Sequence, residues 1–131
     1  MTYRELYDAA VRAVAEGGAE SNTEDYEERA QYLLATFCFE CAGLDALWCA
    51  ANGTSSKGAP ETVCVSLDSP FGLSDAFAPA AIYYLAAMLV LDENEEMSES
   101  FLARYSDQLA TLRASLPMGK ERIRDHYPDL A

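Results

Sequence analysis

The sequence predicts a mainly α-helical fold: a small bundle of about four helices, with a short β-strand or hairpin between the second and the third. Apolar residues recur at helical spacing in separate segments, which glycine, proline or polar runs divide from one another. One further segment alternates and is rich in β-branched residues, as expected for a strand. With 131 residues, 50% of them hydrophobic, the chain can bury the core of one domain.

The first two helices are predicted in the N-terminal half. Apolar residues at helical spacing in residues 3–14 indicate about four turns, which Gly17-Gly18 ends. A second helix is expected at residues 23–51, where acidic residues crowd the first turns and suit the helix dipole. Because that length is unusual, we expect a kink near Gly43.

The connection between the second and third helices is expected to contain the strand. Residues 54–60 form a polar loop, and the alternating segment 62–67 follows as a short strand. A single strand leaves the backbone groups on its edges unpaired. It therefore needs a partner, which a neighbouring subunit could supply, or it stays an extended loop.

Two further helices are predicted in the C-terminal half. Residues 81–91 are almost uniformly apolar, Ser74 can cap the helix that contains them, and Pro79 lies near its first turn. The acidic residues 92–96 connect this helix to a fourth one at about residues 96–115. Because the connection is short, we expect the two helices to be antiparallel neighbours.

The chain is predicted to divide into one helical domain, residues 1–116, and an extended C-terminal tail, residues 117–131. Pro117 and Gly119 end the regular pattern, and the tail beyond them holds isolated apolar residues suited to docking. The only histidine, His126, also lies in the tail. One chain therefore cannot form a His-centred triad or a two-His metal site.

The chain is strongly acidic, with a formal net charge of −13 and a pI near 4.2. Direct binding to nucleic acid needs Lys and Arg against phosphates, so this charge argues against it. The charge is also uneven, because residues 58–103 contain no Lys or Arg, while four of the nine bases follow residue 112. We expect an acidic body with a basic-leaning tail that could meet an acidic partner.

No targeting or membrane-spanning segment is predicted. The N-terminus lacks the apolar run of a signal peptide. The apolar stretch that comes closest to a span, residues 76–91, is too short and contains Pro79. We therefore expect a cytosolic protein with no membrane contact, in which the four cysteines are free thiols.

The cysteines are candidate metal ligands, but their spacing argues against that role. Cys38 and Cys41 lie within the second predicted helix, and adding Cys49 and Cys64 reproduces no standard zinc module. Free cysteine packs as a small hydrophobic residue, so we expect core cysteines. The acidic residues 92–96 lack the register of a calcium-binding EF-hand. We assign no metal or cofactor ligand.

No catalytic residue is assigned either. Glu40 and Asp45 are the carboxylates of the apolar second helix, and a carboxylate pair can act as general acid and base. Because they are five residues apart, a regular helix does not place them on one face. A small enzyme built on Glu40 or Asp45 is the third interpretation, which a deep pocket around a carboxylate of raised pKa would support.

Two adjacent tyrosines predict a second surface on the third helix. Tyr83 and Tyr84 cannot both face one core, so we expect one of them in the core and the other at an interface. Tyrosine suits interfaces because it is large and keeps a polar tip. With Val63 and Val65 of the predicted strand, these residues form the expected subunit interface.

Four features follow one another in residues 60–127. They are the apolar run Pro79-Ala80-Ala81-Ile82-Tyr83-Tyr84-Leu85-Ala86-Ala87, the acidic link Asp92-Glu93, the helix segment Phe101-Leu102-Ala103-Arg104-Tyr105 with Leu109 and Leu112, and the charged end Ile123-Arg124-Asp125-His126-Tyr127. In these features the chain resembles the small head–tail connector proteins, or head-completion adaptors, of tailed bacteriophages and prophages.

The resemblance implies a non-catalytic helical subunit that forms a ring beneath the portal protein. Such a ring prolongs the DNA channel and offers a platform for neck or tail components, first in the bacterial cytoplasm during assembly and then in the virion neck. A ring of acidic subunits repels the duplex, so DNA would pass through without specific binding. The tail would reach the portal through Arg122, Ile123, Arg124, Tyr127 and Leu130.

A second interpretation is a cytosolic helical interaction or regulatory module without catalytic activity, which dimerises through its apolar helices. Neighbouring genes for portal, terminase and tail proteins would favour the adaptor over this module.

Overall fold

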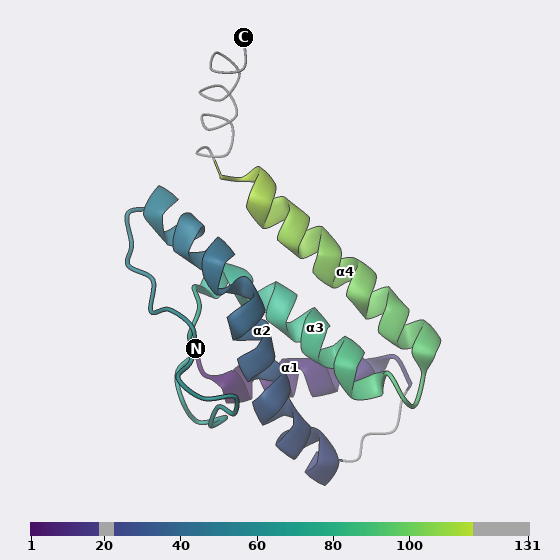
Figure 1. Ribbon diagram of the computed structural model, residues 1–131. Helices are drawn as coiled ribbons and strands as arrows, with labels where there is room; N and C mark the ends of the chain where they lie inside the picture. Colours follow the sequence, from purple (N-terminus) through teal and green to yellow (C-terminus); the bar gives the residue numbers. More distant parts are fainter. Residues whose placement is uncertain (19–22, 117–131) are drawn as a thin grey trace.

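Four α-helices and one short 3-10 turn make up the described part of the chain, residues 1–18 and 23–116 (Figure 1). This computed structural model confirms the predicted mainly helical fold, in which a bundle packs around one helix. The predicted tail, residues 117–131, lies outside the described residues. The elements are α1 Tyr3–Glu16, α2 Thr23–Ala51, η1 Asp75–Phe77, α3 Ala78–Val90 and α4 Glu95–Ala114.

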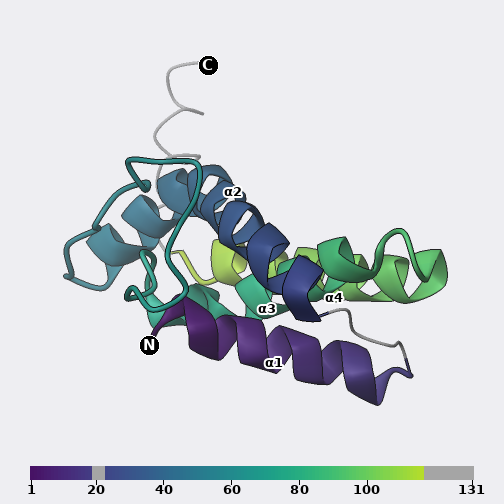
Figure 2. The same cartoon turned by 90° about the horizontal axis from the view of Figure 1, so that it is seen from below.

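Helix α3 lies at the centre of the bundle. Helix α4 packs antiparallel along it, as predicted, and α1 and α2 pack against its other sides (Figures 1 and 2). Small alanine side chains let the neighbouring helices approach closely. The α3 residues with no exposed surface are Ala80, Ala81, Leu85, Ala86, Ala87, Leu89 and Val90.

Helix α1 forms as predicted because its apolar residues share one face. The Thr2 hydroxyl accepts a hydrogen bond from the Glu5 amide at 3.3 Å and caps the first turn. Burying each large apolar side chain contributes roughly 1.5–3 kcal/mol, which fastens this face to the core. The buried residues of α1 are Tyr3, Leu6, Tyr7, Ala10 and Val14.

Helix α2 runs without interruption from Thr23 to Ala51, which confirms the predicted length, and the kink expected near Gly43 stays a prediction. Side chains on both sides of Gly43 are anchored in the core, among them Phe37 and Cys49. Tertiary packing of this kind outweighs the low helix propensity of a single glycine. After the helix, Gly53 adopts a φ of 70°, the left-handed conformation in which glycine commonly ends a helix.

Among the described residues, α2 is also long and apolar enough to cross a membrane, judged by length and composition alone, because an 18-residue stretch within Asp25–Ala51 has a mean hydropathy of 1.5. The expectation that residues 76–91 come closest to a bilayer span is therefore wrong. In this fold α2 buries Leu34, Phe37 and Cys38 in the core, as core helices of globular proteins do. We interpret its composition as two apolar faces, one turned inward and one outward.

The predicted strand at residues 62–67 is not formed, and this described segment is irregular. Its backbone pairs with helices instead. The Val65 amide donates to the Gln31 carbonyl at 3.1 Å, and the Leu67 carbonyl accepts from the Arg4 amide at 2.7 Å. Because the first amides of α1 have no partner inside their own helix, the segment satisfies them without a second strand.

A short acidic turn joins α3 to α4, as predicted. The Asn94 side-chain oxygen accepts a hydrogen bond from the Met97 amide at 3.0 Å and caps α4. The Glu93 carboxylate accepts one from the buried Tyr26 hydroxyl at 2.8 Å, which ties the turn to α2. Burial and this carboxylate raise the pKa of Tyr26.

Replacing Gly43 by alanine is expected to stabilise the fold. A Cβ at Gly43 would meet no atom within 4 Å, so the change adds helix propensity without a clash. We expect a gain of about 1 kcal/mol in the free energy of unfolding in urea. The matched control is Gly53→Ala, which should lose stability because its φ of 70° strains any residue with a Cβ. A loss at Gly43 would contradict an open position in mid-helix.

Candidate interaction surfaces

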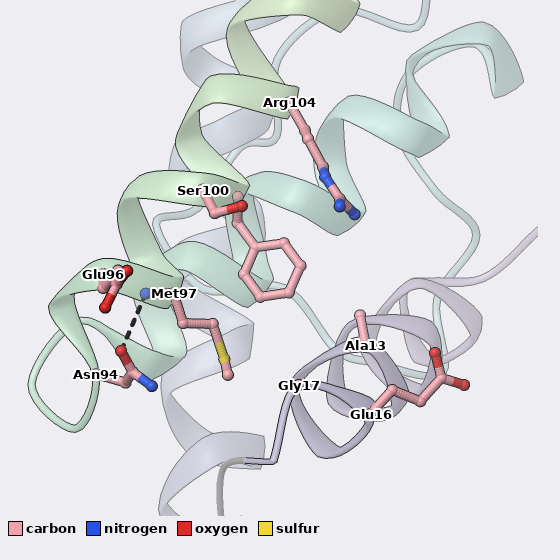
Figure 3. A pocket seen from close by; sticks show the side chains of 9 residues that line it. Ala13, Glu16, Gly17, Asn94, Glu96, Met97, Ser100 and Arg104 are labelled. Carbon is pink, nitrogen blue, oxygen red and sulfur yellow. Dashed lines mark hydrogen bonds between the residues drawn. The ribbon is translucent and has the colours of Figure 1, made fainter.

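A hollow of about 470 Å³ lies between the end of α1 and the beginning of α4 (Figure 3). It exists because both helices pack chiefly on α3 rather than on each other. We call it the α1–α4 groove and define it by its lining residues. They are Ala13, Glu16 and Gly17 at the α1 side, and Asn94, Glu96, Met97, Ser100, Phe101 and Arg104 at the α4 side.

The apolar part of the groove depends on Gly17 and Met97. A Cβ at Gly17 would come within 2.5 Å of the Met97 methyl carbon, so a larger residue there would push this flexible side chain away from the end of α1. Met97 is half-buried and Phe101 is buried. Methionine is unbranched and adapts to irregular contacts, so this wall of the groove can adjust its shape.

A single cation lies over the aromatic part of the groove. The Arg104 guanidinium carbon is 5.8 Å from the centre of the Tyr83 ring and 6.0 Å from that of Phe101. Such contacts are worth about 0.5–1 kcal/mol at exposed sites. Within residues 1–18 and 23–116, Arg104 makes no ion pair. It therefore offers a positioned charge for a carboxylate from outside.

A second surface lies on the outer side of α2. Tyr32, Phe39 and Leu47 are 51%, 45% and 37% exposed, which is unusual for large apolar side chains. Their spacing of seven and eight residues places them on one helix face, with exposed Thr36 and Gly43 between them. We call these five residues the α2 ridge. None of them carries a charge, although the chain as a whole has a net charge of −13.

The outer apolar face of α2 was not predicted from the sequence. A signal was present, because residues 30–51 contain only two charged residues, Glu40 and Asp45. A surface helix normally carries charged and polar residues on its outward face.

The predicted interface residues are divided by the fold. Tyr84 is buried at 6% exposure, while Tyr83 is half-buried at the surface, which confirms that only one of the pair faces the core. Val65 is also buried, at 8% exposure, whereas Val63 is 69% exposed. We therefore drop Val65 and Tyr84 from the predicted interface, because this chain's own core covers them.

The tail residues predicted to bind a partner lie outside the described residues. They are Arg122, Ile123, Arg124, Tyr127 and Leu130, and the single histidine, His126, lies there as well.

Asp45 is buried, at 1% exposure, and its carboxylate accepts hydrogen bonds from residues of α2 and of the connection between α2 and α3. One carboxylate oxygen accepts from the Ser74 amide at 3.0 Å and from the Cys49 thiol at 3.8 Å. The other accepts from the Ser56 hydroxyl at 3.3 Å. The bonds from Ser56 and Ser74 hold the irregular connection between α2 and α3 against α2. Glu40 is exposed and does not contact Asp45 as a carboxylate pair. The geometry gives Asp45 a structural role.

The cysteines behave as core residues, which confirms that prediction for Cys38, Cys41 and Cys49, while Cys64 is half-buried. All of them are free thiols. Burial raises the pKa of the Cys41 thiol to about 11, so it is protonated and a poor nucleophile near neutral pH. In the described part of the chain, no group of three or more His, Cys, Asp or Glu residues is placed to hold a metal ion.

No family model matches the chain, and neither a curated protein nor a solved structure matches it. The likeness to connector proteins therefore stays a prediction from the sequence. The function is inferred from the exposed surfaces.

Replacing Asp45 by alanine is expected to lower the free energy of unfolding in urea by about 1–3 kcal/mol, because the Ser74 amide loses its acceptor. Asp45→Asn keeps an acceptor oxygen and should lose less. Glu40→Ala, on the exposed side of the same helix, should stay within about 0.5 kcal/mol of the wild type. Equal stabilities of the Asp45→Ala variant and the wild type would contradict the structural role.

Proposed function

We propose that the protein is a non-catalytic assembly adaptor of the head–tail connector type, which forms a ring beneath a phage portal protein. The α2 ridge is the observation that carries this proposal. Tyr32, Phe39 and Leu47 expose large apolar side chains on one helix face in a strongly acidic chain. Exposed apolar patches of this kind characterise protein interfaces.

The charge of the chain supports the same proposal. A net charge of −13 disfavours contact with phosphates, so a ring of such subunits would let DNA slide through without specific binding. The partners are then the portal protein, further copies of this chain, and neck or tail components. The ring would be assembled in the bacterial cytoplasm and remain in the virion neck. The proposal involves no membrane, metal or cofactor.

A cytosolic helical interaction or regulatory module is the second candidate, because the α2 ridge would also serve dimerisation of such a protein. Binding to a portal protein distinguishes the two candidates.

The adaptor function is tested by co-sedimentation with the portal protein encoded near this chain's gene. We expect the full chain to bind, and a chain ending at residue 117 to lose binding while its circular dichroism and melting stay unchanged. Failure of the full chain to bind would contradict the adaptor. Equal binding by the shortened chain would contradict only the assignment of Arg122, Arg124 and Tyr127 to the portal contact.

A further inference from the structure

We propose that the α2 ridge of one copy docks into the α1–α4 groove of a second copy, so that copies associate head to tail. This inference rests on the proposed function, and it names the two surfaces through which the ring would form.

The ridge supplies a convex, uncharged contact. Tyr32 and Phe39 project large rings, and the absence of a side chain at Gly43 leaves the helix backbone open beside them. Aromatic residues of this kind are enriched among those that dominate interface energies, because they bury a large area with few rotatable bonds.

The groove supplies the concave counterpart. Its volume of about 470 Å³ is within the roughly 300–1,000 Å³ typical of binding pockets, which leaves room for aromatic side chains. Met97 can adjust to what enters, and Phe101 provides an apolar floor. Figure 3 shows Arg104 reaching toward the hollow, while the carboxylates of Glu16 and Glu96 point away from it on opposite sides.

One set of unlike charges lies beside the two surfaces, while Glu16 and Glu96 also line the groove with their carboxylates turned away from the hollow. Glu28 and Glu40 are exposed on α2 beside the ridge, and neither makes an ion pair within the described residues. Arg104 in the groove also has no carboxylate partner there. Docking of the ridge would bring these unlike charges together at the edge of the contact, which favours this orientation.

The same charges disfavour pairing of two ridges. Two α2 helices packed face to face would set two ridges against each other that are both flanked by the carboxylates Glu28 and Glu40. The nearest base on α2, Arg29, already bonds Asp25 and the Met88 carbonyl. No base of the ridge would compensate this repulsion. Ridge and groove are different surfaces of one chain, so the same contact can repeat from one copy to the next. The series closes into a ring where the rotation between neighbouring copies divides a full turn evenly.

Two glutamate variants and one control test this contact by sedimentation equilibrium. Gly43→Glu places a charge in the ridge at a position with open space. Ser100→Glu places a charge in the groove, four residues before Arg104, and the control Ser106→Glu adds the same charge to α4 outside ridge and groove. We expect the wild type and the control to self-associate, and each glutamate variant in the ridge or groove to do so roughly tenfold or more weakly.

Mixing the two defective variants gives the decisive result. Gly43→Glu keeps an intact groove and Ser100→Glu keeps an intact ridge, so the mixture should form one-to-one dimers and nothing larger. Circular dichroism melting of each variant verifies that it is folded.

The inference is overturned if Ser100→Glu associates like the wild type, if the mixture forms no dimer, or if the wild type stays monomeric at about 1 mM. Portal binding of the wild type is measured separately. Retained portal binding together with any of these results overturns only the ridge-to-groove contact, whereas absent portal binding contradicts the adaptor function itself.

Discussion

Helix α3 has no polar face, and this constraint organises the rest of the molecule. Its alanines and leucines are driven out of water, so α1, α2 and α4 each present an apolar face to it. The small side chains of Ala80, Ala81 and Ala87 let these helices come close. Because α1 and α4 both pack on α3, the space between the end of α1 and the beginning of α4 stays open as the α1–α4 groove.

Burial of α3 does not use all the apolar surface that the chain carries. Helix α2 covers the core with one face and still exposes Tyr32, Phe39 and Leu47 on the other. The protein is thus stable as a bundle and keeps an apolar surface to spare. Ridge and groove lie on different elements, which suits assembly from identical copies better than a closed dimer does.

Local signals in the sequence predicted the helices well. Spacing of apolar residues located α1, and the acidic turn before α4 placed its start within one residue of Glu95. The strand at residues 62–67 failed for a physical reason. Its alternation holds only for Val65 and Leu67, which are buried while Val63 is exposed, and pairing is decided by distant groups. The Gln31 carbonyl and the Arg4 amide occupy the bonds that a second strand would have used.

The surfaces were harder to predict than the helices. The groove requires the packing of three helices, which no local pattern specifies, and the position of Arg104 over Tyr83 follows from that packing. The ridge could have been predicted, since residues 30–51 carry so few charges. Its apolar residues were not recognised because α2 also carries apolar residues that face the core. Burial of Asp45 likewise became visible only with the fold of the connection around Ser56 and Ser74.

Hydroxyl-radical footprinting at increasing protein concentration measures most directly whether the α2 ridge and the α1–α4 groove form an interface. Tyr32 and Phe39 report on the ridge and Met97 on the groove, and all three side chains react readily when they are accessible to water. The account predicts that oxidation of all three falls together as copies associate, while that of Leu91, which is exposed elsewhere, stays unchanged. Protection of the ridge without protection of Met97, or of neither surface, would contradict it.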